Sequence, residues 1–269
     1  KKLLEINKIV DSLKSKTAKE IVKYLYEGIP VGNFALYEPM LNFKTAKVYD
    51  FNKKQKKFYL DNIKNCILAI SAFKEIFKKN KISAVTVYNS YYGKNRCVRF
   101  LAKKYKIKTI TIHAGANFEN YLKTLLITSE ELVDLELIQK NKIWPKLKNI
   151  STVKESIEQT RYHFLSSFKS NYSYAYSPEL IGKFNLREKF KIKDNQKIIL
   201  LALSSPDEKQ AEKQTNIPMS TMKDFKNTKS LIKFMVNYVK SKKDTFLIIR
   251  VHPREYKNKR ENYISENYY

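Results

Sequence analysis

Two apolar, β-branched segments enclose a helical pattern in the first half of the chain, and this order restricts the fold more than any other feature. The segments are Ile82–Ser90 and "IKTITIHAGAN" at Ile107–Asn117. Between them, apolar residues recur at helical spacing, at Val98, Leu101, Ala102 and Tyr105. Strand, crossover helix and strand form a right-handed unit with parallel strands. We therefore expect Tyr88–Ser90 and His113–Asn117 to lie side by side at one sheet edge, where α/β sheets bind ligands.

The same order returns near the C-terminus. Lys197–Leu203 is typical of a buried strand, and polar turn residues follow it at 204–207. An amphipathic helix comes next, with its apolar stripe at Leu231, Phe234, Met235, Tyr238 and Val239. A second strand then leads into "RVHPRE" at 250–255. The chain thus contains two α/β halves, each with a pair of polar strand ends, and we place the connection between them at the Tyr- and Ser-rich segment Ser170–Leu180.

Helical patterns surround these units. Apolar spacing predicts helices within residues 3–26, over 53–79 and over 151–169, the last with Ser151 as its N-cap. The two cysteines, Cys66 and Cys97, fall in apolar helical patterns and belong to no CxxC pair, so we expect buried free thiols in a reducing cytoplasm.

The chain is strongly basic, with a formal net charge of +27. Only seven of its 53 basic residues are arginine, and the lysines are spread along the whole sequence. A solvated basic surface explains this distribution better than a nucleic-acid footprint, so no nucleic-acid partner is expected. Peripheral contact with an anionic inner membrane is compatible with it. No apolar run is long enough to span a membrane, and no signal peptide is visible.

The last strand end concentrates residue types that are scarce in this chain. Arg250, His252 and Arg254 alternate by two, so in an extended strand they share a face. Together with Ser204 and Ser205 after the neighbouring strand, they are candidates for gripping a phosphate or diphosphate. For the residues after the last strand, the alternative is a structural Arg–Glu pair beside a structural His. For the two serines, the alternative is an ordinary serine turn.

Candidates for a second site follow the first pair of strands. His113 is the first candidate for a general base because histidine side chains commonly transfer protons near neutral pH, and Glu119 is the second. Asn89, Tyr88 and Asn117 are candidates for binding a sugar acceptor, and Tyr91 and Tyr92 could line the same site, although Tyr is common in this chain. A structural role for His113 remains the alternative. The sequence has no GxGxxG, GxxxxGK[ST], HExxH or GxSxG motif and no Asp-x-Asp pair, so we expect no metal site and no cofactor.

Three stretches together resemble bacterial surface-polysaccharide glycosyltransferases, in particular capsule-biosynthesis enzymes with two Rossmann-like domains (the GT-B architecture). They are "GIPVGNFALYEPML", "AVTVYNSYYGKNRCVRFLAKKYKIKTITIHAGAN" and "IILLALSSPDE … FLIIRVHPRE". The resemblance implies an N-terminal acceptor-side domain at 1–180 and a partial donor-side domain at 181–269. It also implies that a nucleotide sugar binds at the second domain, with His252 and Arg254 on the donor side and His113 in the acceptor-side loop.

The chain departs from this pattern in length. A complete second Rossmann-like domain needs roughly 150 residues, and 76 remain from Asp194 to Tyr269. Since the sequence also begins at Lys1 rather than Met, we expect a fragment. The leading hypothesis is a metal-independent glycosyltransferase of the cytoplasm or inner membrane face, with a nucleotide-sugar donor and a glycan or lipid-linked glycan acceptor. A nucleotide-sugar 2-epimerase and a non-catalytic basic module that binds nucleic acid or membrane are the alternatives.

Overall fold

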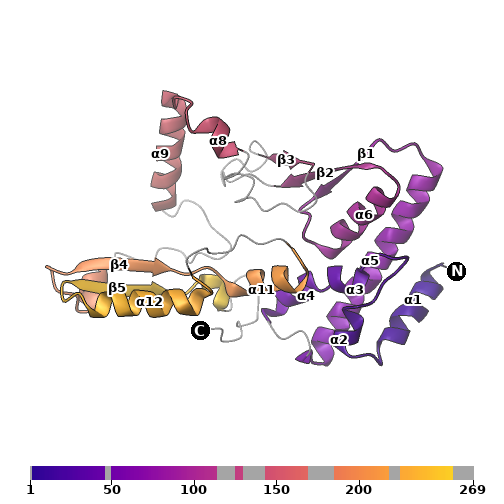
Figure 1. Cartoon of the computed structure of the whole chain (residues 1–269), viewed down its shortest axis with the longest axis horizontal. Helices are drawn as coiled ribbons and strands as arrows, with labels where there is room; N and C mark the ends of the chain where they lie inside the picture. The colour runs from indigo at the N-terminus through magenta and orange to yellow at the C-terminus, as the bar shows by residue number, and fades with distance from the viewer. Residues whose placement is uncertain are drawn as a thin grey trace. The chain divides into compact units, whose positions relative to one another are not determined.

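The computed structural model describes residues 2–45, 50–113, 125–129, 143–168, 185–217 and 225–256. The chain divides into two compact units (Figure 1). Unit 1 comprises Lys1–Ile150 and Asp207–Ser220, and unit 2 comprises Ser151–Pro206 and Thr221–Tyr269. The predicted domain boundary at residue 180 lies outside the described residues, and the segment 207–220 groups with unit 1.

Unit 1 contains a small mixed sheet and a set of helices. Its elements are α1 (Lys2–Leu13), α2 (Ala18–Ile21), α3 (Val31–Phe34), α4 (Tyr37–Phe43), α5 (Lys53–Lys79), β1 (Ala84–Tyr88), α6 (Gly93–Lys104), β2 (Lys108–His113), β3 (Leu126–Thr128), α8 (Trp144–Leu147) and most of α11 (Pro206–Gln214). The predicted helix at 53–79 is confirmed. The region 3–26 instead holds two helices, α1 and α2, and α2 begins at the capping box formed by Thr17 and Glu20.

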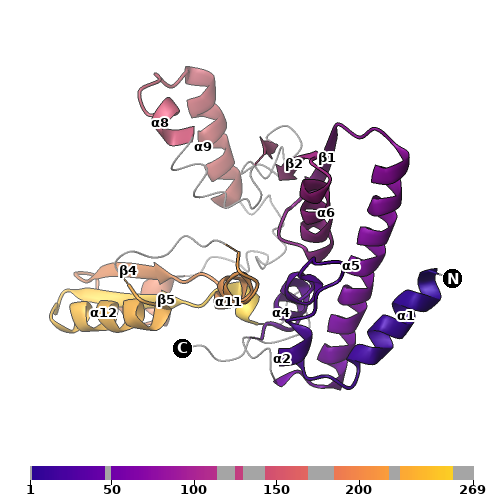
Figure 2. The same ribbon diagram turned by 45° about the vertical axis from the view of Figure 1, so that its right-hand side comes forward.

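The core of unit 1 lies between α5, α6 and the sheet. Helix α5 begins where Asn52 and Gln55 satisfy each other's backbone amides, at 2.9 Å in both directions. Its apolar stripe, which includes Ile63, Ile67 and Ile70, is fully buried. Helix α6 packs on α5 and also on β1 and β2 (Figure 2). Burial of each such isoleucine stabilises the fold by about 1.5–3 kcal/mol.

The predicted strand–helix–strand unit is confirmed. β1 and β2 pair in parallel, from Ala84↔Lys108 to Tyr88↔Ile112. β3, which the sequence patterns did not indicate, pairs antiparallel with β2. Burial alternates along β1, where Val85 and Val87 are buried and the residues beside them are exposed.

Unit 2 contains a two-stranded parallel sheet. Its elements are α9 (Lys154–Phe168), α10 (Leu186–Lys189), β4 (Lys197–Ala202), α12 (Thr228–Lys240), β5 (Thr245–Arg250) and the short 3-10 helix η3 (Pro253–Glu255). β4 pairs with β5 from Lys197↔Thr245 to Ala202↔Arg250. Helix α12 lies along this pair in both views (Figures 1 and 2) and packs on β5.

Two local predictions for unit 2 are wrong. β4 is not a buried strand: Leu200 is 59% exposed, because the described residues place two strands and one packed helix in this sheet, which leaves part of its apolar surface open. Ser151 is not the N-cap of the following helix, because α9 begins at Lys154. The structure is thus a mixed α/β arrangement with two small sheets, each containing a parallel pair.

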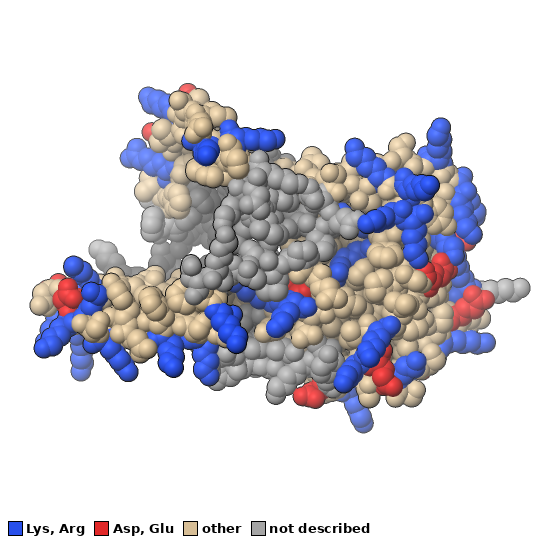
Figure 3. All heavy atoms as spheres, in the orientation of Figure 1, with Lys and Arg blue, Asp and Glu red and all other residues tan. Residues whose placement is uncertain are grey.

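Basic side chains project from both units over the face shown in Figure 3 and do not gather into one patch there. Within the described ranges, no helix has both the length and the apolar character needed to cross a bilayer.

Candidate functional site

The carboxyl ends of β4 and β5 lie next to each other in unit 2. The ladder ends with Ala202 opposite Arg250, and the Leu203 amide donates to the Arg250 carbonyl at 3.0 Å. The two outgoing turns, Ser204–Ser205 and His252–Glu255, therefore start from adjacent positions. This parallel register brings the five predicted phosphate-binding residues to one sheet edge.

One hydrogen bond joins the two turns. Ser205 Oγ donates to Glu255 Oε1 at 2.7 Å, and both residues are buried. The Ser205 hydroxyl thus joins the two turns at this edge. The alternative interpretation of the sequence had paired Glu255 with an arginine, and the hydrogen bond described here joins its carboxylate to Ser205 instead.

The segment after β5 does not continue as a strand. His252 caps η3: its Nδ1 accepts a hydrogen bond from the Arg254 amide at 3.1 Å, and its carbonyl accepts from the Glu255 amide at 2.9 Å. Pro253 supplies the fixed φ that starts this turn. The prediction that Arg250, His252 and Arg254 share one strand face is wrong, because the strand ends at Arg250 and the 3-10 turn changes the direction of the chain beyond it.

These residues differ in how they meet solvent. Arg250 and Ser204 are exposed, His252 is partly buried, and Arg254 is buried. Since Nδ1 of His252 accepts a hydrogen bond, the neutral ring carries its proton on Nε2. Among the predicted phosphate-binding residues, Arg250, Ser204 and the partly buried His252 are therefore accessible to an anion from solvent.

The strand ends of unit 1 hold the predicted acceptor-side residues. The rings of Tyr88 and His113 stack, with centroids 5.8 Å apart and planes 11° from parallel. Asn89 adopts a left-handed backbone conformation (φ 53°), and its side-chain oxygen accepts from the Tyr91 amide at 2.9 Å. This bond shapes the turn into α6. Asn117 and Glu119 lie outside the described residues.

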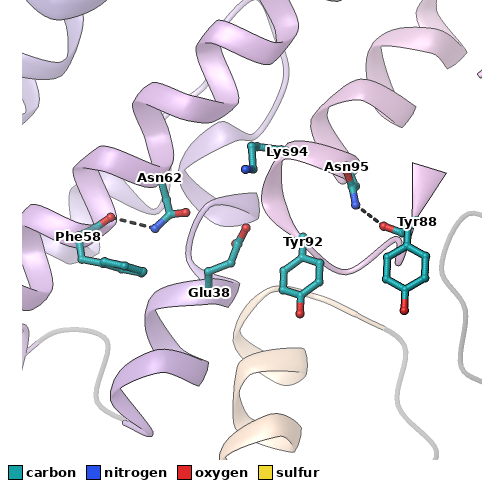
Figure 4. Close-up of a pocket in the computed structure, with 7 residues that line it drawn as sticks. All are labelled: Glu38, Phe58, Asn62, Tyr88, Tyr92, Lys94 and Asn95. Atoms are coloured by element: carbon teal, nitrogen blue, oxygen red, sulfur yellow. Dashed lines mark hydrogen bonds between the residues drawn. The ribbon is translucent and has the colours of Figure 1, made fainter. Parts of the chain in front are cut away.

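A cavity of about 440 Å³ opens beside the end of β1 (Figure 4). It is lined by Glu38, Phe58, Asn62, Tyr88, Tyr92, Lys94 and Asn95, which come from α4, α5, β1 and the start of α6. Of these residues, sequence reasoning had singled out Tyr88 and Tyr92 as candidates for a sugar site. A carboxylate inside the apolar stretch "FALYEPML" was the available signal for Glu38, because its neighbours Tyr37, Pro39 and Met40 are buried.

Glu38 lines this cavity from α4. Both of its carboxylate oxygens lie 3.2 Å from the Gly93 amide, the first residue of α6. Helix α6 has no side-chain cap from its own N-cap residue, Tyr92, so the Glu38 carboxylate supplies a partner for its N-terminus. Burial raises the pKa of Glu38, and the Gly93 amide together with the charges of Lys94 and Arg96 partly opposes that increase.

Arg96 holds the neighbouring structure in place. Its guanidinium lies 4.1 Å from the centroid of the Phe34 ring and donates to the Thr215 carbonyl at 2.8 Å. Burial lowers the pKa of Arg96 to about 10, so it remains charged at neutral pH. This contact, with the one from Asn33 Nδ2 to the Gln214 carbonyl at 3.0 Å, ties the end of α11 to α3 and α6.

Among the described residues, no three or more His, Cys, Asp or Glu side chains come together as metal ligands could. Comparisons with protein-family models, with curated proteins and with solved structures found no match to this chain.

Proposed function

We propose that this chain is part of a glycosyltransferase that moves a sugar from a nucleotide-sugar donor to a surface polysaccharide, of the capsule or lipopolysaccharide type. The observation that carries the proposal is the parallel end of β4 and β5, where Ser204 and Arg250 are exposed beside His252. In open α/β sheets, ligands bind outside the carboxyl ends of the strands. The resemblance to two-Rossmann glycosyltransferases supports the same assignment.

The exposed groups suit the leaving group of such a reaction. When the sugar is transferred, the bond between its anomeric carbon and the phosphate oxygen breaks, and the nucleotide leaves with the electron pair. Arg250 offers a planar fork of donors that matches phosphate, and His252 offers a ring donor. Such cationic and polar donors stabilise the charge that develops on the departing phosphate. The proposed reaction needs no metal ion, as the resemblance implies.

The buried members of the group have a supporting role in this proposal. The hydrogen bond from Ser205 to Glu255 fixes the spacing of the two turns, and the 3-10 turn fixes the His252 ring. We place the reaction in the cytoplasm, with the dispersed lysines available for peripheral contact with an anionic membrane.

Binding of the nucleotide part of the donor tests the proposal. Isothermal titration calorimetry of the full chain with UDP, GDP, dTDP, CMP and ADP should identify one preferred nucleotide. Arg250→Ala and His252→Ala should each weaken that affinity about tenfold or more, because a hydrogen bond to a charged group contributes about 1.5–3 kcal/mol. Lys197→Ala is the matched control, since it removes an exposed cation from the opposite end of the same sheet.

Three results would count against the proposal. Unchanged nucleotide affinity in both variants overturns the assignment of the β4–β5 edge. Equal loss in Lys197→Ala, with steep salt dependence for any polyanion, indicates the basic binding module instead. An epimer formed from the nucleotide sugar without any acceptor indicates the 2-epimerase.

A further inference from the structure

The cavity beside β1 combines aromatic, amide and charged groups in one place. The side chains of Tyr88 and Tyr92 extend in the same direction, and the Glu38 carboxylate points into the space near Lys94 (Figure 4). Tyr88 is 58% exposed and Tyr92 is 39% exposed, so both rings present apolar surface to solvent. A cavity of about 440 Å³ has room for a monosaccharide ring.

The amide groups of the cavity are held rigidly. Asn62 Nδ2 donates to the Phe58 carbonyl at 2.9 Å, which is one turn earlier in α5. Asn95 Nδ2 donates to the carbonyls of Tyr88 and Asn89, the latter at 2.8 Å. These bonds fix both side chains through their NH₂ groups and orient their oxygens, which can accept hydrogen bonds from a ligand.

The charges of the cavity restrict the chemistry of its ligand. A purely apolar ligand would remove Glu38 and Lys94 from water without replacing their hydrogen bonds, which is costly. A phosphate would meet the Glu38 carboxylate and be repelled. A sugar avoids both problems, because its hydroxyls donate to a carboxylate and accept from an ammonium or amide group, while its C–H faces pack on tyrosine rings.

Glu38 has the properties of a proton acceptor. It is partly buried, and its carboxylate accepts from the Gly93 amide and from its own backbone amide, while two carboxylate oxygens together can accept about four hydrogen bonds. The charged or titratable groups near it are Lys94 and Arg96 from α6, Tyr37 from α4, Tyr92 before α6 and Cys66 from α5. Burial raises its pKa, and a raised pKa makes a carboxylate a stronger proton acceptor.

We infer that this cavity is the acceptor subsite, which takes a neutral sugar ring of the growing glycan, and that Glu38 is the catalytic base. In the step we propose, a hydroxyl of that sugar gives its proton to a Glu38 carboxylate oxygen. The hydroxyl oxygen forms a bond to the anomeric carbon of the donor, the bond from that carbon to the phosphate oxygen breaks, and the nucleotide leaves with the electron pair. The inference rests on the proposed function for its reaction, and it gives the base role to Glu38 instead of His113 or Glu119.

Sugar binding at the cavity can be tested without any donor. Saturation-transfer difference NMR with methyl glycosides of glucose, galactose, mannose and N-acetylglucosamine should give signals for at least one of them with the wild-type chain. Tyr92→Ala should remove at least about half of that signal, because sugar stacking on an aromatic ring supplies a large share of such weak binding. Tyr238→Ala is the matched control, since it removes a tyrosine of similar exposure (44%) from unit 2.

The base role needs a separate measurement. The donor in this assay is a nucleotide sugar that carries the preferred nucleotide, and the acceptor is the methyl glycoside that binds. Glu38→Gln should lower the transfer rate by about 10²-fold or more, since a general base accelerates a reaction by about 10²- to 10⁴-fold. The amide of Gln still accepts from Gly93, so α6 keeps its cap. The wild-type rate should rise with pH through the pKa of Glu38, and the variant should lose that rise, which a purely structural cap would not cause. Glu75→Gln, on the surface of α5, is the control.

The outcomes separate this inference from the proposed function. Wild-type glycoside signals that persist in Tyr92→Ala, or no glycoside signal at all, overturn the subsite while leaving nucleotide binding at β4–β5 intact. A Glu38→Gln variant that transfers sugar at more than half the wild-type rate overturns the base. Glycoside binding without any nucleotide binding or transfer supports the subsite and overturns the proposed glycosyltransferase.

Discussion

The Ser205 hydroxyl lies 2.7 Å from Glu255 Oε1 and donates a hydrogen bond to it across the ends of two parallel strands. Fifty residues separate the two in sequence, and both side chains are buried. Because a buried carboxylate is stable only with partners, this bond makes the turn after β4 and the turn after β5 depend on each other.

We expect Ser205→Ala to loosen both turns together. Loss of a donor to a buried charged acceptor costs about 1–3 kcal/mol, so amides of residues 203–205 and 251–256 should exchange with deuterium about 10- to 100-fold faster. Hydrogen-exchange mass spectrometry of the full chain measures both segments at once. Ser204→Ala changes the exposed neighbouring serine. It should change the free energy of opening of either segment by no more than about 0.5 kcal/mol. Faster exchange in the β4 turn alone would contradict the coupling.

The sequence predicted the elements that depend on local patterns. The helix α5 was predicted from an apolar stripe of period 3.6, and the capping box of Asn52 and Gln55 fixes where it begins. Parallel pairing followed from the strand–helix–strand order, and with it the proximity of Ser205 to the β5 turn. By contrast, β3 is three residues long, and α11 joins the core of unit 1 through Ala211, a distant contact that no local pattern encodes.

The sites show the same division. Proximity at a sheet edge could be predicted because strand register fixes it, but side-chain direction could not. The 3-10 turn at Pro253 rotates Arg254 into the interior, and period-two alternation does not describe that turn. Glu38 was missed because its partner is the backbone amide of Gly93, 55 residues away, and a backbone amide leaves no trace in residue type.

The stability of the chain should depend on pH through Glu38 in a defined direction. Burial raises the folded-state pKa of Glu38 above the ordinary value of 4.5. Between pH 4.5 and that raised pKa, the folded state binds the proton more tightly than the unfolded state does. Its contribution to stability is therefore fully present below pH 4.5 and is lost as the pH rises through the folded-state pKa. Urea unfolding of wild type and Glu38→Gln at several pH values measures this, and the variant should gain relative stability as pH rises.

Glu75 on α5 should give the opposite dependence of stability on pH. The hydrogen bond from Lys2 lowers its pKa below 4.5, with Lys79 adding to the effect. Its contribution is therefore present above pH 4.5 and is lost as the pH falls through the folded-state pKa. Glu75→Gln should differ from wild type by a constant amount above pH 4.5, and that difference should shrink in acid. A rise in relative stability with pH like that of Glu38→Gln would contradict the origin of both effects.

The two thiols should be unreactive in the folded chain. Cys66 and Cys97 are fully buried, and the hydrogen bond with the Cys97 thiol, together with burial, raises the pKa of Cys66. The thiolate is the reactive form, so modification requires an opening that costs at least about 3 kcal/mol, or about 100-fold in rate. Reaction with Ellman's reagent should be slow in buffer and rapid for both thiols in denaturing guanidinium. Equal rates in the two solvents would show that α5 and α6 do not pack as described.

Arg96 should control whether α11 stays on unit 1. Its guanidinium stacks on Phe34 and donates to the Thr215 carbonyl, so Arg96→Met removes a charge-assisted bond worth about 1.5–3 kcal/mol and a cation–π contact while keeping an apolar side chain. We expect amides of residues 208–217 to exchange at least about tenfold faster, with α5 unchanged. Arg161→Met, which removes an exposed arginine from α9, is the matched control and should leave that segment as it is. Unchanged protection of residues 208–217 in Arg96→Met would mean that Ala211 and Ile217 hold the segment by apolar burial alone.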